Sequence, residues 1–178
     1  LRSEGAILED VTIGHTKEIG PIYVHIALPE AAAYHAATLE SRPQDYTEKV
    51  RLRLEMGRYI VAEDYVRAQR GRQVLTQEVR AAMSGRDGLL LPSVPVPATK
   101  LGVPMVSIGD VEEPVRNITL GLTQLFNITG HPAISLPCGK TDEGLPVGLQ
   151  IVGARNKTPE LLQIAAAVEQ VLSHNAVE

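Results

Sequence analysis

Apolar residues recur at helical spacing in several parts of the chain. Over residues 61–84 they return at every third, fourth or seventh position, which predicts one long helix, and Gly85 follows as a residue that ends helices at low cost. An alanine-rich run predicts another helix over 31–39, opened by Pro29-Glu30 and stopped before Pro43. A further helix is expected over 46–56.

The last helix has the most complete set of signals. Thr158 can cap it, Pro159 suits its first turn, and the charge of Glu160 complements the positive end of the helix dipole. Its apolar positions form one stripe that we expect to be buried: Leu161, Ile164, Ala165, Val168 and Leu172. A short helix is also expected over 120–126.

Short apolar runs bounded by glycine and proline predict strands. Residues 133–136 and 147–152 flank a turn-rich, glycine-containing loop, so we expect 133–138 and 147–152 to pair as a hairpin. The continuous apolar run 89–91 is typical of a strand covered on both faces. Residues 5–13 are rich in β-branched residues and predict one more strand.

Polar and proline positions complete the pattern. Gln150 stands among apolar neighbours in a predicted strand, so we expect it to reach a hydrogen-bond partner. Residues 92–97 contain three prolines, each lacking a donor for a sheet, and should be extended but irregular. Residues 98–116 are interpreted as a surface excursion. The pattern therefore predicts an α/β fold, a mixed sheet flanked by helices, in one segment spanning 1–178.

Composition narrows the class of protein. The 178 residues are 44% hydrophobic but 3% aromatic, so the core must consist of aliphatic side chains. A net charge of −4 without a sustained basic stripe argues against nucleic-acid binding. No apolar run reaches the roughly 20 residues of a membrane span, and no signal peptide is visible. The single cysteine, Cys138, fits a reducing compartment. We expect a cytoplasmic protein with no membrane partner.

The residue types that carry chemistry form no recognisable motif on their own. None of the five histidines is spaced as zinc ligands are, so no metal or cofactor is expected. Neither a phosphate-binding glycine loop nor a nucleophile elbow is present. Ser93 lies between prolines at a predicted strand end, but no base accompanies it, and a turn residue is the ordinary interpretation. The residues alone indicate an α/β fragment of unreadable activity.

Four segments, in order, resemble the C-terminal half of the amidase-signature family. They are RLRLEMG at 51–57 with DYVRAQR at 64–70, DGLLLPSVPVPA at 87–98, FNITGHPAISLPCG at 126–139, and GLPVGLQIVG at 144–153. The alanine-rich helix and the final helix also fall where the family has them, so the resemblance covers nearly the whole chain. It implies that the chain is the C-terminal portion of the amidase-signature fold.

The resemblance implies an activity that this chain cannot perform alone. The family hydrolyses carboxylic amides to acid and amine through a Ser–cis-Ser–Lys triad, with backbone donors of a Gly/Ser-rich loop holding the oxyanion. Residues 1–178 contain no comparable Gly/Ser-rich run, and their lysines match none of the family's catalytic context. The triad should therefore lie upstream, in a missing N-terminal part of the same domain. We expect no catalytic residue in this chain, and no turnover by it.

The resemblance also suggests which residues contact the substrate. Fatty-acid amide hydrolases of the family line their acyl channel just before the Asn-x-x-x-x-Pro stretch, which by position points to Leu120, Thr123 and Phe126. A related glutaminase, part of the tRNA-dependent amidotransferase, binds glutamine with an arginine, matched by Arg53, and with an acid, replaced here by Leu120. We expect a small amide less polar than glutamine. Core packing, or an ion pair for Arg53, is the structural alternative.

Three functions are open from the sequence. The first is an amide hydrolase seen in part, the second is the glutaminase of the amidotransferase, and the third is a non-catalytic binding module from a truncated gene. If upstream elements complete the sheet, the isolated chain should expose more apolar surface than the roughly 300–600 Å² patch of an ordinary monomer. Self-association into a homo-oligomer would hide that surface.

Overall fold

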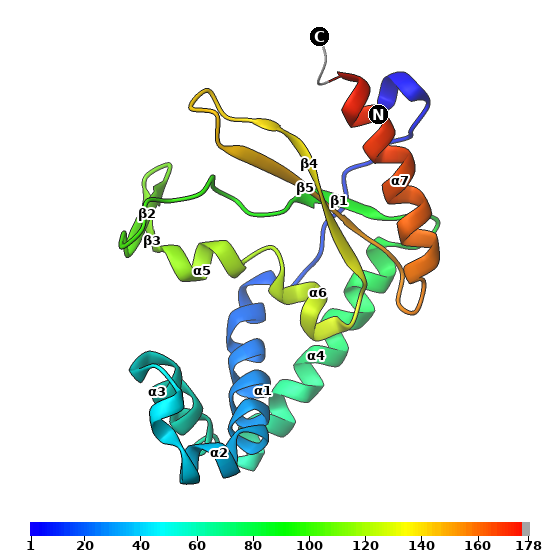
Figure 1. Ribbon diagram of the computed structural model, residues 1–178. Helices are drawn as coiled ribbons and strands as arrows, with labels where there is room; N and C mark the ends of the chain where they lie inside the picture. The colour runs from blue at the N-terminus through cyan, green and yellow to red at the C-terminus, as the bar shows by residue number, and fades with distance from the viewer. Residues whose placement is uncertain (176–178) are drawn as a thin grey trace. The chain divides into compact units, whose positions relative to one another are not determined.

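The structure, a computed structural model, describes residues 1–175 (Figure 1). The chain forms two compact units, which we call the sheet unit and the helical unit. The sheet unit contains residues 1–14 and the chain from residue 78 onward, and the helical unit contains residues 15–77. Helix α4 (Ala62–Ala82) contributes to both, because the boundary falls inside it.

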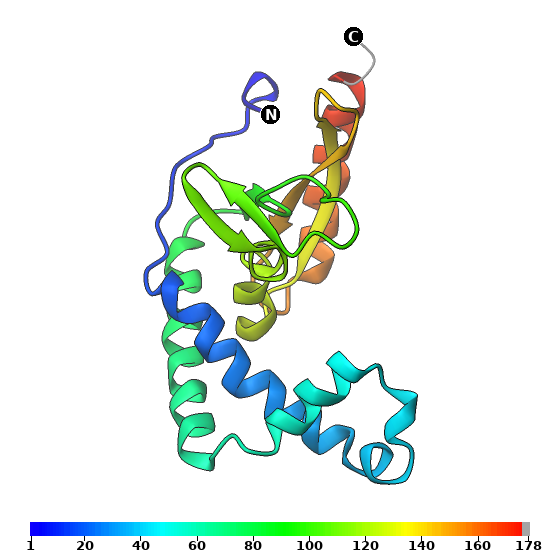
Figure 2. The ribbon, with the colours of Figure 1, turned by 90° about the vertical axis from the view of Figure 1, so that its left-hand side faces the viewer.

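The helical unit packs its helices through glycine contacts. Its elements are η2 (Thr16–Glu18), α1 (Ile19–Tyr34), α2 (Ala36–Ser41), η3 (Pro43–Asp45), α3 (Glu48–Gly57) and the first part of α4 (Figure 2). A Cβ atom at Gly57 would lie 2.2 Å from the carbonyl oxygen of Leu28 and 3.0 Å from the Cβ of Ala32. A Cβ at Gly71 would lie 2.7 Å from the Cδ1 of Ile22. These two glycines therefore let α3 and α4 approach α1 closely.

Helix α1 begins earlier than the sequence predicts. It starts at Ile19 and runs through Pro29, so the expectation that Pro29 opens a helix over 31–39 was wrong. A proline inside a helix withholds one N–H, here from the carbonyl of His25, and its ring crowds that turn. Burial of the apolar side of α1, where Ile26 is only 5% exposed, offsets this local cost. The expected stop before Pro43 is confirmed, because α2 ends at Ser41.

The helices expected over 46–56 and 61–84 are confirmed. Helix α3 spans Glu48–Gly57, and α4 spans Ala62–Ala82. Gly85 follows α4 in the left-handed conformation at φ 72°, which glycine adopts without the clash of a Cβ atom.

The sheet unit contains two antiparallel sheets. A three-stranded sheet has the order β1-β5-β4, formed by β1 (Leu89–Pro92), β5 (Pro146–Val152) and β4 (Ala133–Lys140). A two-stranded sheet pairs β2 (Met105–Ile108) with β3 (Val111–Pro114). The remaining elements are η1 (Arg2–Glu4), α5 (Val115–Leu120), α6 (Gln124–Thr129) and α7 (Thr158–Asn175). The α/β class and the β4–β5 hairpin are confirmed.

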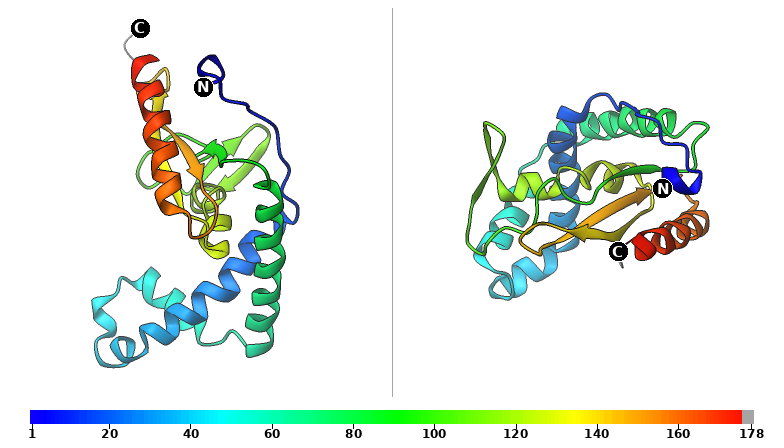
Figure 3. Two further views of the ribbon diagram at one scale, coloured as in Figure 1. Left: turned by 90° about the vertical axis from the view of Figure 1, so that its right-hand side faces the viewer. Right: turned by 90° about the horizontal axis from the view of Figure 1, so that it is seen from above.

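The three-stranded sheet lies between α7 on one side and α5 and α6 on the other (Figure 3). Leu136 and Ile151 form a core with Leu161 and Ala165 of α7. The other predicted stripe residues pack against this core: Ile164, Val168 and Leu172. Full burial of each such aliphatic side chain contributes roughly 1.5–3 kcal/mol. The predicted buried stripe of α7 is thus confirmed, although Thr158 takes the first helical position and not the cap.

Two strand predictions fail in part. Residues 6–13 form no strand, and Ile7 is 88% exposed, because no neighbouring strand accepts their backbone hydrogen bonds. An ion pair joins this segment to the rest of the sheet unit, with 2.7 Å between Glu9 Oε2 and Arg86 NH2. Strand β1 exists as predicted, but it is not covered on both faces, since Leu90 is 38% exposed.

The region between β1 and β4 is more ordered than expected. The surface excursion predicted for 98–116 contains the β2–β3 hairpin. The single helix expected over 120–126 is two helices, α5 and α6, which meet at a turn over residues 121–123. Within residues 1–175, no helix has both the length and the apolarity of a membrane span. Several large apolar side chains are exposed, with Leu101 at 103%, but the area of a continuous patch stays a prediction.

Candidate functional site

Gln150 fixes the α5–α6 turn over the sheet. Its neighbour Ile151 faces α7, so strand alternation points Gln150 to the opposite face, where it is 5% exposed. The Nε2 amide of Gln150 donates a hydrogen bond to the carbonyl oxygen of Leu122 at 3.1 Å. The partner that the sequence required for this polar strand residue is therefore the backbone between α5 and α6.

The turn brings Leu120 and Thr123 together. Leu120 is the last residue of α5, and its carbonyl oxygen accepts from both the N–H of Thr123, at 3.1 Å, and the Thr123 hydroxyl, at 3.2 Å. Both side chains are half-buried. The two residues are joined by a turn and not by the one continuous helix that was expected, and their role in a pocket stays a prediction.

Phe126 lies deeper than the other two candidate pocket residues. It is 4% exposed in α6, and its carbonyl oxygen accepts hydrogen bonds from the N–H groups of Gly130 and His131 at 2.9 and 3.1 Å. Gly130 ends α6 in the left-handed conformation at φ 71°. This burial favours a packing role for Phe126, while a pocket role for it stays a prediction.

Two serine hydroxyls meet on the sheet face that Gln150 occupies. Ser135 is the register partner of Gln150 in β4, and Ser93 follows β1 and donates its N–H to the carbonyl oxygen of Gly148 at 2.9 Å. The two Oγ atoms lie 2.5 Å apart. A Cβ atom at Gly148 would lie 2.7 Å from the Ser93 Oγ and 2.8 Å from that of Ser135. The two hydroxyls can therefore meet above β5, because Gly148 has no side chain there.

The end of α6 bonds the side chain of His131. The Thr129 hydroxyl donates to the carbonyl oxygen of Leu125 at 2.8 Å, so it accepts from His131 Nδ1, also at 2.8 Å, and this nitrogen carries the proton. Burial, and secondarily the positive charge of Arg155, lower the pKa of His131. The lowered pKa favours the uncharged form of His131, and its bond to Thr129 joins the segment before β4 to the end of α6. Among the described residues, no three His, Cys, Asp or Glu side chains gather as metal ligands would.

Arg53 lies in α3, in the helical unit, whereas Leu120, Thr123 and Phe126 lie in the sheet unit. The Arg53 side chain is half-buried and makes no hydrogen bond or ion pair within residues 1–175. Its neighbours differ, because Arg51 pairs with Glu55 at 3.9 Å and Arg58 pairs with Glu40 at 3.5 Å. The alternative of a structural ion pair for Arg53 thus finds no partner among the described residues.

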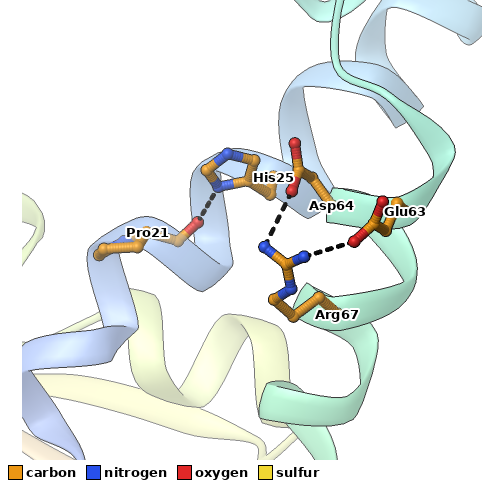
Figure 4. Close-up of polar contacts among 5 residues, drawn as sticks. All are labelled: Pro21, His25, Glu63, Asp64 and Arg67. Atoms are coloured by element: carbon orange, nitrogen blue, oxygen red, sulfur yellow. Dashed lines mark hydrogen bonds and ion pairs between the residues drawn. The ribbon is translucent and has the colours of Figure 1, made fainter.

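The start of α4 offers a second candidate surface, where the charge of Arg67 is already paired. A shallow concavity is lined by residues of this one helix: Ala62, Glu63, Val66, Arg67 and Arg70. The Arg67 guanidinium bonds Glu63 Oε1 at 2.7 Å and Asp64 Oδ1 at 3.2 Å (Figure 4). In the same region His25 Nδ1 contacts the carbonyl oxygen of Pro21 at 2.8 Å. A surface that is lined by one helix, and whose Arg67 is already paired with two carboxylates, is a poor ligand site.

Comparison with known proteins identifies the family. Residues 1–162 match the family model described as Amidase. The chain belongs to the Amidase family. An amidase of Pseudomonas putida is 38% identical over 147 residues, covering 82% of this chain and 31% of the relative. The glutamyl-tRNA(Gln) amidotransferase A subunit of Brevibacillus brevis is 32% identical over 195 residues, covering 96% of this chain and 39% of the relative.

Solved structures agree with this assignment. A crystal structure of an amidase superposes with a TM-score of 0.88 at 31% identity, covering 95% of this chain and 38% of that one. A 6-aminohexanoate cyclic dimer hydrolase superposes with a TM-score of 0.77 at 25% identity, covering 96% and 38%. This Amidase-family chain therefore spans 31–39% of the length of these relatives.

Three of the four segments that resemble the family converge on one face of the sheet. Residues 87–98 supply Ser93, residues 126–139 supply Ser135, and residues 144–153 supply both Gly148 and Gln150. Sequence reasoning singled out Ser93 and Gln150 but missed Ser135. The available signal was the register of the predicted hairpin, which places Ser135 opposite Gln150 in this Amidase-family fold.

Proposed function

We propose that this chain is the C-terminal part of an amide hydrolase that converts small carboxylic amides to acid and amine. The observation that carries the proposal is the TM-score of 0.88 with an amidase over 95% of the chain. The Pseudomonas putida amidase supports it with 38% identity. A cytoplasmic location, suggested by the single cysteine, belongs to the same proposal.

The proposal assigns bond cleavage to a part of the protein outside residues 1–178. Amide hydrolysis needs a nucleophile, a base that activates it, and donors that hold the oxyanion. Among the described residues, no basic side chain is hydrogen-bonded to Ser93 or Ser135, and His131 bonds Thr129 and neither serine. A Ser–cis-Ser–Lys triad would supply these groups from the portion of the relatives that this chain does not span.

The part of this chain in the reaction is to bind and orient the amide. In the proposal, Leu120 and Thr123 form a wall for the acyl group in the sheet unit. A substrate contact of Arg53, in the helical unit, is a separate proposal that rests on the resemblance and on its lack of a partner among the described residues. A leucine at position 120 favours an apolar acyl group, because a buried polar group without a partner there costs about 1–3 kcal/mol. The favoured substrate is therefore less polar than glutamine.

A second candidate is the glutaminase of a tRNA-dependent amidotransferase. The observation that favours it is the extent of similarity: the glutamyl-tRNA(Gln) amidotransferase A subunits of Brevibacillus brevis and Parvibaculum lavamentivorans match 96% and 99% of this chain. Arg53 would then bind the glutamine. Leu120 weighs against this candidate, because it puts an apolar side chain where the acid that binds glutamine is expected.

The test compares the intact natural protein with the 178-residue chain alone. Both are assayed against aliphatic amides, aryl amides and glutamine. We expect the intact protein to hydrolyse an aliphatic or aryl amide, and the chain alone to hydrolyse none. Turnover by the chain alone would contradict the proposal. Hydrolysis of glutamine in preference to all other amides would favour the amidotransferase glutaminase. Inactivity of both, with amide binding retained, would favour a binding module.

A further inference from the structure

We propose that the hydroxyl pair of Ser93 and Ser135 selects amides that carry a polar group on the acyl chain. The pair would donate a hydrogen bond to a hydroxyl or carbonyl oxygen of the substrate, next to the apolar wall at Leu120. This inference rests on the proposed function, and it adds a specificity site that the resemblance to the family does not assign.

The first support is position on the sheet. Ser135 pairs with Gln150 across β4 and β5, and Gln150 bonds the backbone of the turn that carries Leu120 and Thr123. The hydroxyl pair and the turn therefore lie on the same face of the three-stranded sheet. One strand residue separates the anchor of the turn, Gln150, from the hydroxyls that meet over Gly148.

The second support is the count of hydrogen-bond donors. Each serine hydroxyl has one donor and two acceptor positions. The contact between Ser93 and Ser135 uses one of the two O–H groups, and among the described residues neither side chain has another hydrogen-bond partner. One O–H therefore stays free.

The third support is access. Ser135 is exposed and Ser93 is half-buried, so a small molecule can reach the pair within the sheet unit. The two hydroxyls fill the space above Gly148, so a ligand oxygen would approach the pair from the side that faces away from β5. The residue types match the ligand, because a fixed hydroxyl recognises an oxygen acceptor without adding charge to an apolar pocket.

The experiment measures the preference of the intact protein for glycolamide over propionamide. These amides have nearly the same size, but glycolamide has a hydroxyl where propionamide has a methyl group. We expect the ratio of their kcat/KM values to favour glycolamide in the native protein. The double variant Ser93→Ala/Ser135→Ala should lower that ratio about tenfold by leaving the substrate hydroxyl unpaired. The lower ratio should result from a higher KM for glycolamide, while kcat/KM for propionamide stays unchanged.

Two variants serve as controls. Ser135→Thr keeps the hydroxyl and should retain the preference, whereas Ser107→Ala makes the same chemical change at an exposed position of β2 and should leave the ratio unchanged. An equal fall for both amides in the double variant would indicate a purely structural pair and overturn the inference. An unchanged ratio would overturn it as well.

A binding measurement separates this inference from the proposed function. If the intact protein hydrolyses no amide, the proposed function fails, and glycolamide is titrated into the ¹⁵N-labelled chain instead. Amide signals of residues 93, 135 and 148 should then shift with glycolamide and not with propionamide, and the shifts should vanish in the double variant Ser93→Ala/Ser135→Ala. Absence of such shifts would overturn the hydroxyl site independently of catalysis.

Discussion

Ser93 directly follows β1 and Ser135 lies on β4, two strands that are not neighbours, and their hydroxyl oxygens lie 2.5 Å apart above the strand between them. The contact exists because Gly148, on that middle strand, has no side chain to separate them. The relationship joins β1 and β4 directly, in addition to the backbone ladders that each shares with β5. It makes position 148 sensitive to the smallest possible enlargement.

Gly148→Ala should therefore destabilise the sheet unit. The new methyl group would lie 2.7 and 2.8 Å from the two Oγ atoms and 3.1 Å from the Cβ of Ser93, so the hydroxyls must separate. Overpacking of this kind costs about 1–3 kcal/mol in the free energy of unfolding. Urea denaturation of the 178-residue chain measures it. Gly121→Ala, whose Cβ would meet the Ile118 carbonyl oxygen at 3.4 Å, is the control with a smaller expected effect. An unchanged midpoint for Gly148→Ala would contradict the contact.

Gly57→Ala should have a larger effect, in the helical unit. Its Cβ would lie 2.2 Å from the backbone carbonyl oxygen of Leu28, and a backbone atom cannot rotate away as a side chain does. Helices α1 and α3 must move apart, at a cost of about 3 kcal/mol or more. Hydrogen exchange of the α3 amides should accelerate accordingly. Gly20→Ala, in the first turn of α1 with nothing within 4 Å, should leave exchange slow. Equal behaviour of the two variants would show that α1 and α3 pack less closely.

The stability of the sheet unit should depend on pH through His131. Burial first, and Arg155 second, lower its pKa in the folded chain, so the unfolded chain binds a proton more readily. The free energy of unfolding should therefore fall as pH drops below the ordinary histidine pKa of about 6.5, until the lower folded pKa is reached. Urea denaturation between about pH 5 and pH 8 measures this slope.

Two variants identify the group responsible for that slope. His131→Gln should flatten it in this range, and Arg155→Met should reduce it without abolishing it, because burial of His131 persists. A slope that is unchanged in His131→Gln would assign the pH dependence to other groups.

The elements that the sequence predicts well are those decided by local chemistry. Helix α7 has its proline, its acid and its stripe within one segment, and the β4–β5 hairpin has two apolar runs around a glycine-containing loop. The failures involve tertiary packing. Residues 6–13 have a strand-like composition but no partner strand. Pro29 lies inside α1, where the burial of Ile19, Ile26 and Ala32 stabilises the helix despite the proline.

The candidate site divides in the same way. Gln150 could be recognised because a polar residue in an apolar strand must find a partner, and the structure supplies the Leu122 carbonyl. The contact between Ser93 and Ser135 could not be recognised from the sequence, because these residues are 42 positions apart and meet only through the strand order β1-β5-β4. Leu120 and Thr123 were placed by resemblance, and the turn that joins them depends on Gln150, which lies far along the chain.

Leu120→Asp in the intact protein should shift its preference from apolar amides towards glutamine. The native leucine is half-buried at the end of α5, next to Thr123, and in the proposed function it contacts the acyl group. An aspartate there would place a carboxylate against an apolar acyl chain, so we expect kcat/KM for hexanamide to fall at least about tenfold. The same carboxylate can accept a hydrogen bond from the ammonium group of glutamine, so kcat/KM for glutamine should rise. Leu101→Asp, at a fully exposed position with 103% relative exposure, introduces the same charge away from any wall and should change neither value. If hexanamide and glutamine respond alike to Leu120→Asp, position 120 does not line the acyl site, and the preference for a less polar amide loses its structural basis.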